Sequence, residues 1–233
     1  KGAIVGLNLR WNYIGAAGAA AIASVLESNT TLTSLDLREN KIGVAGATAI
    51  AEALKGNTTL KELHLGYRSM GTEGAAAIAS VLESNTTLTS LNLWNNVIGD
   101  AGAVALALAE ALRDNSTLTS LNLSRNNIGT DGARELAEAL RVNTTLKELS
   151  LSWNRIGDKG ARELAEALRV NSTLTSLDLS PNDIGDEGAA AILDVLKVNT
   201  TLEELSLWGN DIGDAMKSKL KALCKKKRIE LYI

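Results

Sequence analysis

Apolar residues follow two alternating periods along the chain. A segment with a period of two, which indicates a short strand, is built from Leu32, Leu35 and Leu37 with polar residues between them. An apolar set at the spacing i, i+3, i+4 and i+7 comes next, in Ala47, Ile50, Ala51 and Leu54. This spacing places the four side chains on one face of a helix. The pattern therefore predicts a strand followed by an amphipathic helix.

The strand and helix pattern recurs along the chain. The segment LTSLDLREN-KIG at 32–43 returns with few changes at 88–99, 118–129 and 174–185. An asparagine closes most strand segments, at Asn12, Asn40, Asn96, Asn126, Asn154, Asn182 and Asn210. The step between them is a multiple of 28 residues, except that Asn96 and Asn126 are 30 apart. Eight units are visible, and IELYI at 229–233 predicts a closing strand.

The repeat predicts the architecture. One unit cannot bury its own apolar face, whereas stacked units bury a continuous core. Strands stack about 4.8 Å apart and helices need about 8–10 Å, so a stack of such units curves with its strands inside. We expect an α/β solenoid in a single domain over 1–233, shaped as a horseshoe arc with parallel strands on the concave face and helices on the convex face. Residues 214–233 should form a C-terminal capping helix and strand.

Two local expectations follow from the aligned units. The residues at the helix starts should act as N-caps of their own helices, at Thr72, Asp100, Thr130, Asp158 and Asp186. In the third unit Arg68 replaces the closing asparagine, whose side chain should bond to the backbone of the neighbouring turn. We therefore expect looser turns over 66–71.

The consensus LxxLxLxxN-xIGxxGAxxIAxAL resembles the leucine-rich repeat in its ribonuclease-inhibitor-like form, the type that also builds the C-terminal region of NOD-like receptors. The resemblance covers essentially the whole chain. It implies a cytoplasmic, non-catalytic recognition module whose concave face holds a protein. The units are unusually alike, which is typical of recent duplication or of consensus design.

The composition argues against several kinds of functional site. Hydrophobic residues make up 45% of the chain but aromatic residues only 3%, so the core must be built from many small aliphatic layers. Cys224 is the single cysteine and His64 the single histidine, which argues against a disulfide framework and against a metal site. No phosphate-binding glycine motif and no apolar run of membrane-spanning length occurs in the sequence. We expect no enzyme activity, no cofactor and no membrane partner.

Charge is divided unevenly along the chain. Seven basic residues lie in 217–228, whereas the first 216 residues hold 26 acidic and 17 basic ones. An acidic body repels nucleic acid, so we expect no nucleic-acid partner. The basic run could be a localisation signal or a patch for anionic membranes, but we favour a capping helix with a charged exterior.

Positions that differ between units are candidates for specificity. All four tryptophans and one of the three tyrosines fall in the two positions directly after a strand. Tryptophan and tyrosine are enriched at binding hot spots because they bury much area at little entropic cost. Together with polar residues of the strand segments, they form the predicted partner-binding set of Trp11, Arg38, His64, Tyr67, Asn92, Trp94, Asn122, Arg125, Trp153, Asp178 and Trp208. We expect the rings of Tyr67, Trp94, Trp153 and Trp208 to be largely exposed.

Three alternatives remain open. The rings could instead cover neighbouring strand ends in an inert repeat scaffold without a ligand. A GTPase-activating type of enzyme regulator would need an arginine that reaches a nucleotide site, for which Arg38, Arg68 and Arg125 are available. The first strand segment, at 4–9, has no polar element before it. An apolar edge of this kind indicates either a fragment of a longer array or an edge that pairs with another chain, which would make the protein self-associate.

Overall fold

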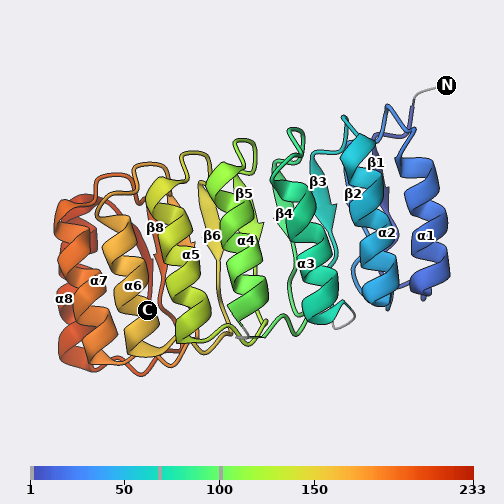
Figure 1. Ribbon diagram of the computed structural model, residues 1–233. Helices are drawn as coiled ribbons and strands as arrows, with labels where there is room; N and C mark the ends of the chain where they lie inside the picture. Colours follow the sequence, from blue (N-terminus) through green and yellow to red (C-terminus); the bar gives the residue numbers. More distant parts are fainter. Residues whose placement is uncertain (1–2, 68–69, 100–101) are drawn as a thin grey trace.

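A computed structural model describes residues 3–67, 70–99 and 102–233, with the backbone alone for 102–107. Strands and helices alternate strictly along the chain (Figure 1). The strands are β1 (Gly6–Asn8), β2 (Ser34–Asp36), β3 (Glu62–His64), β4 (Ser90–Asn92), β5 (Ser120–Asn122), β6 (Glu148–Ser150), β7 (Ser176–Asp178), β8 (Glu204–Ser206) and β9 (Glu230–Tyr232). The helices are α1 (Gly15–Leu26), α2 (Gly43–Gly56), α3 (Gly71–Leu82), α4 (Gly102–Asp114), α5 (Thr130–Val142), α6 (Gly157–Leu168), α7 (Asp186–Val198) and α8 (Asp214–Lys227).

The strands form one parallel sheet in sequence order, from β1 to β9. Equivalent residues pair directly, so that Leu35 lies opposite Leu63 and Leu63 opposite Leu91. The helices form a second layer on one side of this sheet (Figure 1). The predicted α/β solenoid of repeated strand and helix units is therefore confirmed.

The core lies between the sheet and the helix layer. Strand leucines such as Leu63 meet helix residues such as Ile50 and Ile78, and all three are fully buried. Small alanines on the same helix faces, such as Ala47 and Ala75, let neighbouring helices approach closely. Each unit thus completes its core only with the help of the next, as the repeat predicts.

The asparagine that closes a strand ties adjacent units together. Asn126 Nδ2 donates to the carbonyl oxygens of Leu93 at 2.9 Å and Leu123 at 3.0 Å, while its Oδ1 accepts from the backbone N of Asn96 at 2.8 Å. The expected side-chain bonding between turns is confirmed at this position. Arg68 lies outside the described residues, so a looser turn there stays a prediction for amide exchange.

A second asparagine ladder follows the helices. Asn143 Oδ1 accepts from the backbone N of Thr145 at 3.0 Å and Leu146 at 2.8 Å, and its Nδ2 donates to Leu112 O at 2.7 Å. Equivalent asparagines occupy the same buried place, at Asn57, Asn85, Asn115, Asn171 and Asn199. Their Asn-x-Thr pattern matches a glycosylation signal, but these side chains are already bonded inside the turn.

Lys227 continues this second ladder at its C-terminal end. Its Nζ donates to Leu196 O at 2.7 Å and to Asn199 O at 2.5 Å. One unit earlier, Asn199 Nδ2 donates to Leu168 O at 2.9 Å, the carbonyl equivalent to that of Leu196. One residue of the basic run therefore closes the C-terminal turn of α7.

The expected N-caps do not form on their own helices. No side-chain cap hydrogen bond is found at the start of α3, α5, α6 or α7. Thr72, Thr130, Asp158 and Asp186 already lie inside their helices, whereas an N-cap residue must stand outside the first turn. They reach the next unit instead: Thr130 Oγ1, for example, donates to Ile156 O at 3.1 Å. Asp100 lies outside the described residues.

Candidate functional site

Aromatic rings form a line across the ends of the strands. The centroid of the Trp11 ring lies 6.1 Å from that of Tyr67, which lies 5.9 Å from that of Trp94. Farther along, the Trp153 and Trp208 rings are 6.4 Å apart. Arg125 joins the two groups, because its guanidinium carbon lies 5.9 Å from the Trp94 centroid and 4.5 Å from that of Trp153. We call these six residues the aromatic ladder.

The backbone after each strand sets the ladder's position. Trp11, Arg125 and Trp153 have φ values of 63°, 57° and 56°. These values lie in the left-handed region, which residues other than glycine seldom adopt. Tyr67, at φ 100°, also has a positive φ. The chain makes this sharp turn directly after the strand, so the variable side chains lie together along one edge of the sheet.

The rings differ in exposure. Trp153 and Trp208 are 50% and 56% exposed, as expected, and Trp11 is 60% exposed. Trp94 and Tyr67 are half-buried, so the expectation of largely exposed rings is wrong for both. The indole of Trp94 lies against Gly66, where an added Cβ would stand 3.3 Å from the ring, and Tyr67 stacks on the same indole.

Polar residues of the strands lie beside the ladder. His64, Asn92 and Asn122 pair in register on successive strands, and all three are half-buried. Asn92 Oδ1 accepts from Trp94 N, and Asn122 Oδ1 from Ser124 N, both at 2.9 Å. In β7, Asp178 Oδ1 accepts from Ser180 N at 3.0 Å. These side chains brace the turns that carry the ladder.

Arginines near the N-terminal end are paired with carboxylates. Arg38 forms an ion pair with Asp36, with Nη2 and Oδ2 2.6 Å apart, and Arg10 forms one with Glu39 at 2.6 Å. Burial raises the pKa of Asp36, but the hydrogen bonds from Arg38 outweigh it, so the net pKa is lowered. Arg38 is thus held against the sheet. Arg68, one of the three arginines considered for a GTPase-activating role, lies outside the described residues.

His64 is the only titratable imidazole in the sequence. Burial lowers its pKa, and the nearby charge of Arg38 acts in the same direction, against the opposite effects of Asp36 and Glu62. Its Nδ1 is buried and has no hydrogen-bond partner among the described residues. The imidazole is therefore favoured in its neutral form.

Groups suited to catalysis are not gathered here. In the described part of the chain, no three His, Cys, Asp or Glu residues come together as a metal site. Cys224 is buried in the core, and this burial raises the pKa of its thiol.

No helix of the described residues has the length and apolar character needed to cross a membrane.

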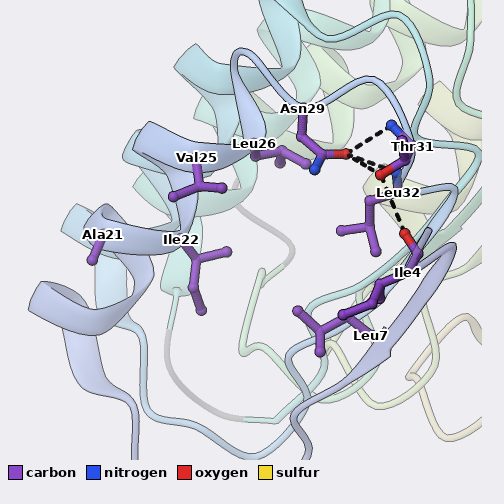
Figure 2. A pocket seen from close by; sticks show the side chains of 9 residues that line it. All are labelled: Ile4, Leu7, Ala21, Ile22, Val25, Leu26, Asn29, Thr31 and Leu32. Carbon is purple, nitrogen blue, oxygen red and sulfur yellow. Dashed lines mark hydrogen bonds between the residues drawn. The ribbon is translucent and has the colours of Figure 1, made fainter. Parts of the chain in front are cut away.

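The N-terminal edge carries an apolar pocket of about 370 Å³ (Figure 2). Its wall is formed by β1 and the segment before it, by α1 and by the turn that follows α1, with side chains of Ile4, Leu7, Ala21, Ile22, Val25, Leu26, Asn29, Thr31 and Leu32. In the next unit, the equivalents of Ile22 and Val25 are Ile50 and Ala53, which are buried, whereas Ile22 is only half-buried and Val25 is 63% exposed. The pocket is therefore the part of the core that a preceding unit covers elsewhere in the solenoid.

Comparison with known proteins agrees with this geometry. A family described as Leucine Rich repeat matches at 6–23, 28–51, 56–79, 84–107 and 114–137. The TMOD/LMOD Leucine-rich domain matches at 133–228. This chain is a leucine-rich repeat protein. No curated protein matches it.

Solved structures share the fold at low identity. A structure described as "Leiomodin-1 Actin-Binding Site 2 (ABS2)" is 22% identical, with a TM-score of 0.53, over 66% of this chain and 88% of that one. The tropomodulin C-terminal domain of Caenorhabditis elegans is 15% identical, with a TM-score of 0.54, over 67% of this chain and 92% of that one. At such identities the likeness concerns the fold.

The structure adds residues to the predicted set. Arg10 lies over the Trp11 ring, with its guanidinium carbon 5.8 Å from the centroid, and it also binds Glu39. The sequence offered a signal, because Arg10 and Glu39 occupy the same variable positions as Trp94 and Arg125. The sequence did not predict that Arg125 lies between two rings, because this contact depends on the spacing of neighbouring units.

Proposed function

We propose that this leucine-rich repeat protein is a non-catalytic recognition module that binds a protein partner through its concave face and the aromatic ladder. The observation that carries the proposal is the continuous line of rings across the strand ends, at positions that the repeat leaves variable. Eight steps of about 4.8 Å give the sheet a span of roughly 38 Å. That length suits a protein interface better than a small-molecule pocket.

The ladder and the strand face would act together. Exposed rings such as Trp153 and Trp208 would supply the apolar anchors. Polar side chains of the strands, such as Asn92, Asn122 and Asp178, would contribute hydrogen bonds to the same partner, with His64 and Arg38 toward the N-terminal end. Arg125 is fixed between two rings and would present its remaining N–H groups at the rim.

The family subtype and location belong to the same proposal. The unit LxxLxLxxN-xIG supports the ribonuclease-inhibitor-like type, which resembles that of NOD-like receptors and implies a cytoplasmic protein. The near identity of the units fits either recent duplication or consensus design. An inert scaffold is the alternative in which the rings hold no partner.

Partner capture tests the function. The wild type and a variant with all four tryptophans changed to alanine would be compared as baits, after both are shown to fold by circular dichroism. Actin is the first defined partner to test by co-sedimentation, since the leiomodin structure is described as an actin-binding site. Capture by the wild type and its loss in the variant are expected. Equal capture by both, or no capture by either, would leave the ladder without a binding role.

The apolar N-terminal edge supports a second proposal, that two copies of this chain associate there. Ile4, Val5 and Val25 are more than half exposed around the apolar pocket, and β1 has a free edge on this side. The opposite end of the solenoid presents the basic helix α8 and does not complement an apolar surface. Association should therefore join two N-terminal edges. Sedimentation should show a concentration-dependent dimer that Val25→Glu abolishes, and a monomer at all concentrations would refute the pairing.

A further inference from the structure

The balance of acidic and basic residues on the sheet face changes along the solenoid. In the last four strands and the residues beside them, 147–153, 175–181, 203–209 and 229–233, one basic residue faces five acidic ones. The acidic residues are Glu148, Asp178, Glu203, Glu204 and Glu230, and the basic one is Lys147. Arg228 lies two residues before Glu230, and counting it reduces the excess from four negative charges to three. The C-terminal part of the sheet face is therefore distinctly acidic.

None of these carboxylates forms an ion pair in the described part of the chain. Toward the N-terminal end, Asp36 and Glu39 have arginine partners at 2.6 Å. Among the ion pairs of the described residues, none includes Glu148, Glu204 or Glu230. Among the described residues, the bonds that these carboxylates accept from side chains come from hydroxyls: Glu204 accepts from Ser176 Oγ at 3.0 Å, and Glu230 accepts from the Tyr232 hydroxyl.

Two of the carboxylates lie directly opposite each other. Glu204 pairs in register with Glu230 on the neighbouring strand, and both are exposed. Like charges at directly opposite strand positions destabilise a sheet. Glu148 stands two strands away from Glu204, or about 10 Å. The sheet thus maintains a repulsion that a cationic group placed over it would relieve.

The aromatic ladder shows how a cation is held on this edge. Three of the tryptophans have an arginine over the ring, with Arg10 5.8 Å from the Trp11 centroid and Arg125 5.9 Å and 4.5 Å from those of Trp94 and Trp153. Trp208 has no basic side chain over its ring among the described residues, although it is 56% exposed. It follows Glu204 by four residues on the same strand segment, so the ring and this carboxylate lie about 13 Å apart along the strand and would take different cationic side chains.

We propose that the C-terminal part of the sheet face binds an extended, arginine- or lysine-rich segment of a protein partner, with a cationic side chain on the Trp208 ring and others over Glu204, Glu230 and Glu148. The proposal rests on the proposed function, since it specifies the partner chemistry for the same concave face. Cation–π contact and carboxylate pairing reinforce each other here because both favour a positive charge. The rise of an extended chain, about 3.3 Å per residue, lets about five residues cross these four strands.

The test uses two synthetic peptides of about eight residues, a length that spans the four strands with a margin. One alternates arginine and alanine, and the other carries the neutral analogue citrulline in place of each arginine. Binding is measured by calorimetry at low and moderate salt, and the indole N–H resonances of the four tryptophans are followed by NMR. We expect the arginine peptide to bind, the citrulline peptide to bind at least about tenfold more weakly, and the Trp208 resonance to shift while that of Trp11 does not.

Matched variants localise the site. Trp208→Ala, and separately Glu204→Gln with Glu230→Gln, should each weaken the arginine peptide roughly tenfold. Two controls should leave its affinity unchanged: Tyr13→Ala, which removes an exposed ring outside the aromatic ladder, and Glu163→Gln with Glu187→Gln on the helix side, which alters the net charge by the same amount. Equal binding of both peptides, no binding of the arginine peptide, or equal loss in the controls overturns the inference. If partner capture still depends on the tryptophans in that case, the proposed function stands and only the cationic partner is wrong.

Discussion

Asp158 of α6 caps α7, the helix of the following unit, through Gly188. Its Oδ1 accepts from the backbone N of Gly188 and of Gly185, both at 2.8 Å. A Cβ on Gly188 would stand 2.8 Å from the same oxygen, so the contact requires glycine at this position. Asp186 repeats the arrangement with Gly213 N at 2.8 Å. The helix starts are thus stabilised across unit boundaries.

Removing this cap should destabilise the protein. Asp158→Ala leaves two N–H groups at the start of α7 without their acceptor and should lower the free energy of unfolding by about 1 kcal/mol. Urea denaturation measures the change. Asp131→Ala is the matched control, because among the described residues the side chain of Asp131 makes an exposed ion pair with Arg134 alone, and its replacement should cost less than about 0.5 kcal/mol. Equal losses in the two variants would contradict the cap.

Asn126 should matter more than any exposed asparagine. It is fully buried, and Asn126→Ala removes the acceptor of the Asn96 backbone N, while Leu93 O keeps its second bond, from Asn96 Nδ2 at 3.1 Å. Loss of a buried hydrogen-bond partner costs about 1–3 kcal/mol, so we expect a loss of this size in unfolding free energy. Asn12→Ala, at the exposed N-terminal end, should cost clearly less. A similar loss for both would show that the ladder bonds add no stability.

The repeat period predicted the fold, because strand pairing and core packing repeat whenever the unit repeats. Leu35, Leu63 and Leu91 need no tertiary information to be placed in one column. The sequence predicted that Asp158 caps its own helix, α6, whereas it caps α7. The pattern within one unit does not reveal a hydrogen bond that joins two units. The burial of Trp94 likewise depended on Gly66 and Tyr67, which meet it only across the sheet. The side-chain contacts between units were therefore the part of the structure that the sequence did not predict.

Trp94 separates binding from folding. Leu93 is fully buried, so Leu93→Ala should cost about 2–5 kcal/mol of unfolding free energy. Trp94 is half-buried at the rim, and Trp94→Ala should cost less than Leu93→Ala while weakening partner binding by about 2 kcal/mol. Denaturation and calorimetry measure the two effects. If Trp94→Ala destabilises the fold as much as Leu93→Ala, the ring belongs to the scaffold.

Lys227 should stabilise the last turn of α7. Lys227→Met keeps the aliphatic part of the side chain but removes the ammonium that bonds Leu196 O and Asn199 O. We expect a loss of about 1–2 kcal/mol in unfolding free energy and faster amide exchange near Asn199. Lys225→Met, an exposed neighbour in the same helix, serves as the control with no change. A basic run that acted only as a signal for another protein would give no difference between the two variants.

His64 should make stability depend on pH below neutrality. Burial lowers its pKa in the folded state, so as the pH falls below about 6.5 the unfolded chain takes up a proton before the folded one does. The contribution of His64 is therefore complete above that pH and decreases as the pH falls below about 6.5, until the folded imidazole is also protonated. Asp36 acts in a lower window, because its lowered pKa makes its contribution disappear only as the pH falls below about 4. His64→Asn, which places the residue of β4 and β5 in β3, should remove the loss that begins below about pH 6.5 and keep the one that begins below about pH 4. Urea unfolding of both proteins at several pH values measures this, and parallel pH profiles would show that His64 is not responsible.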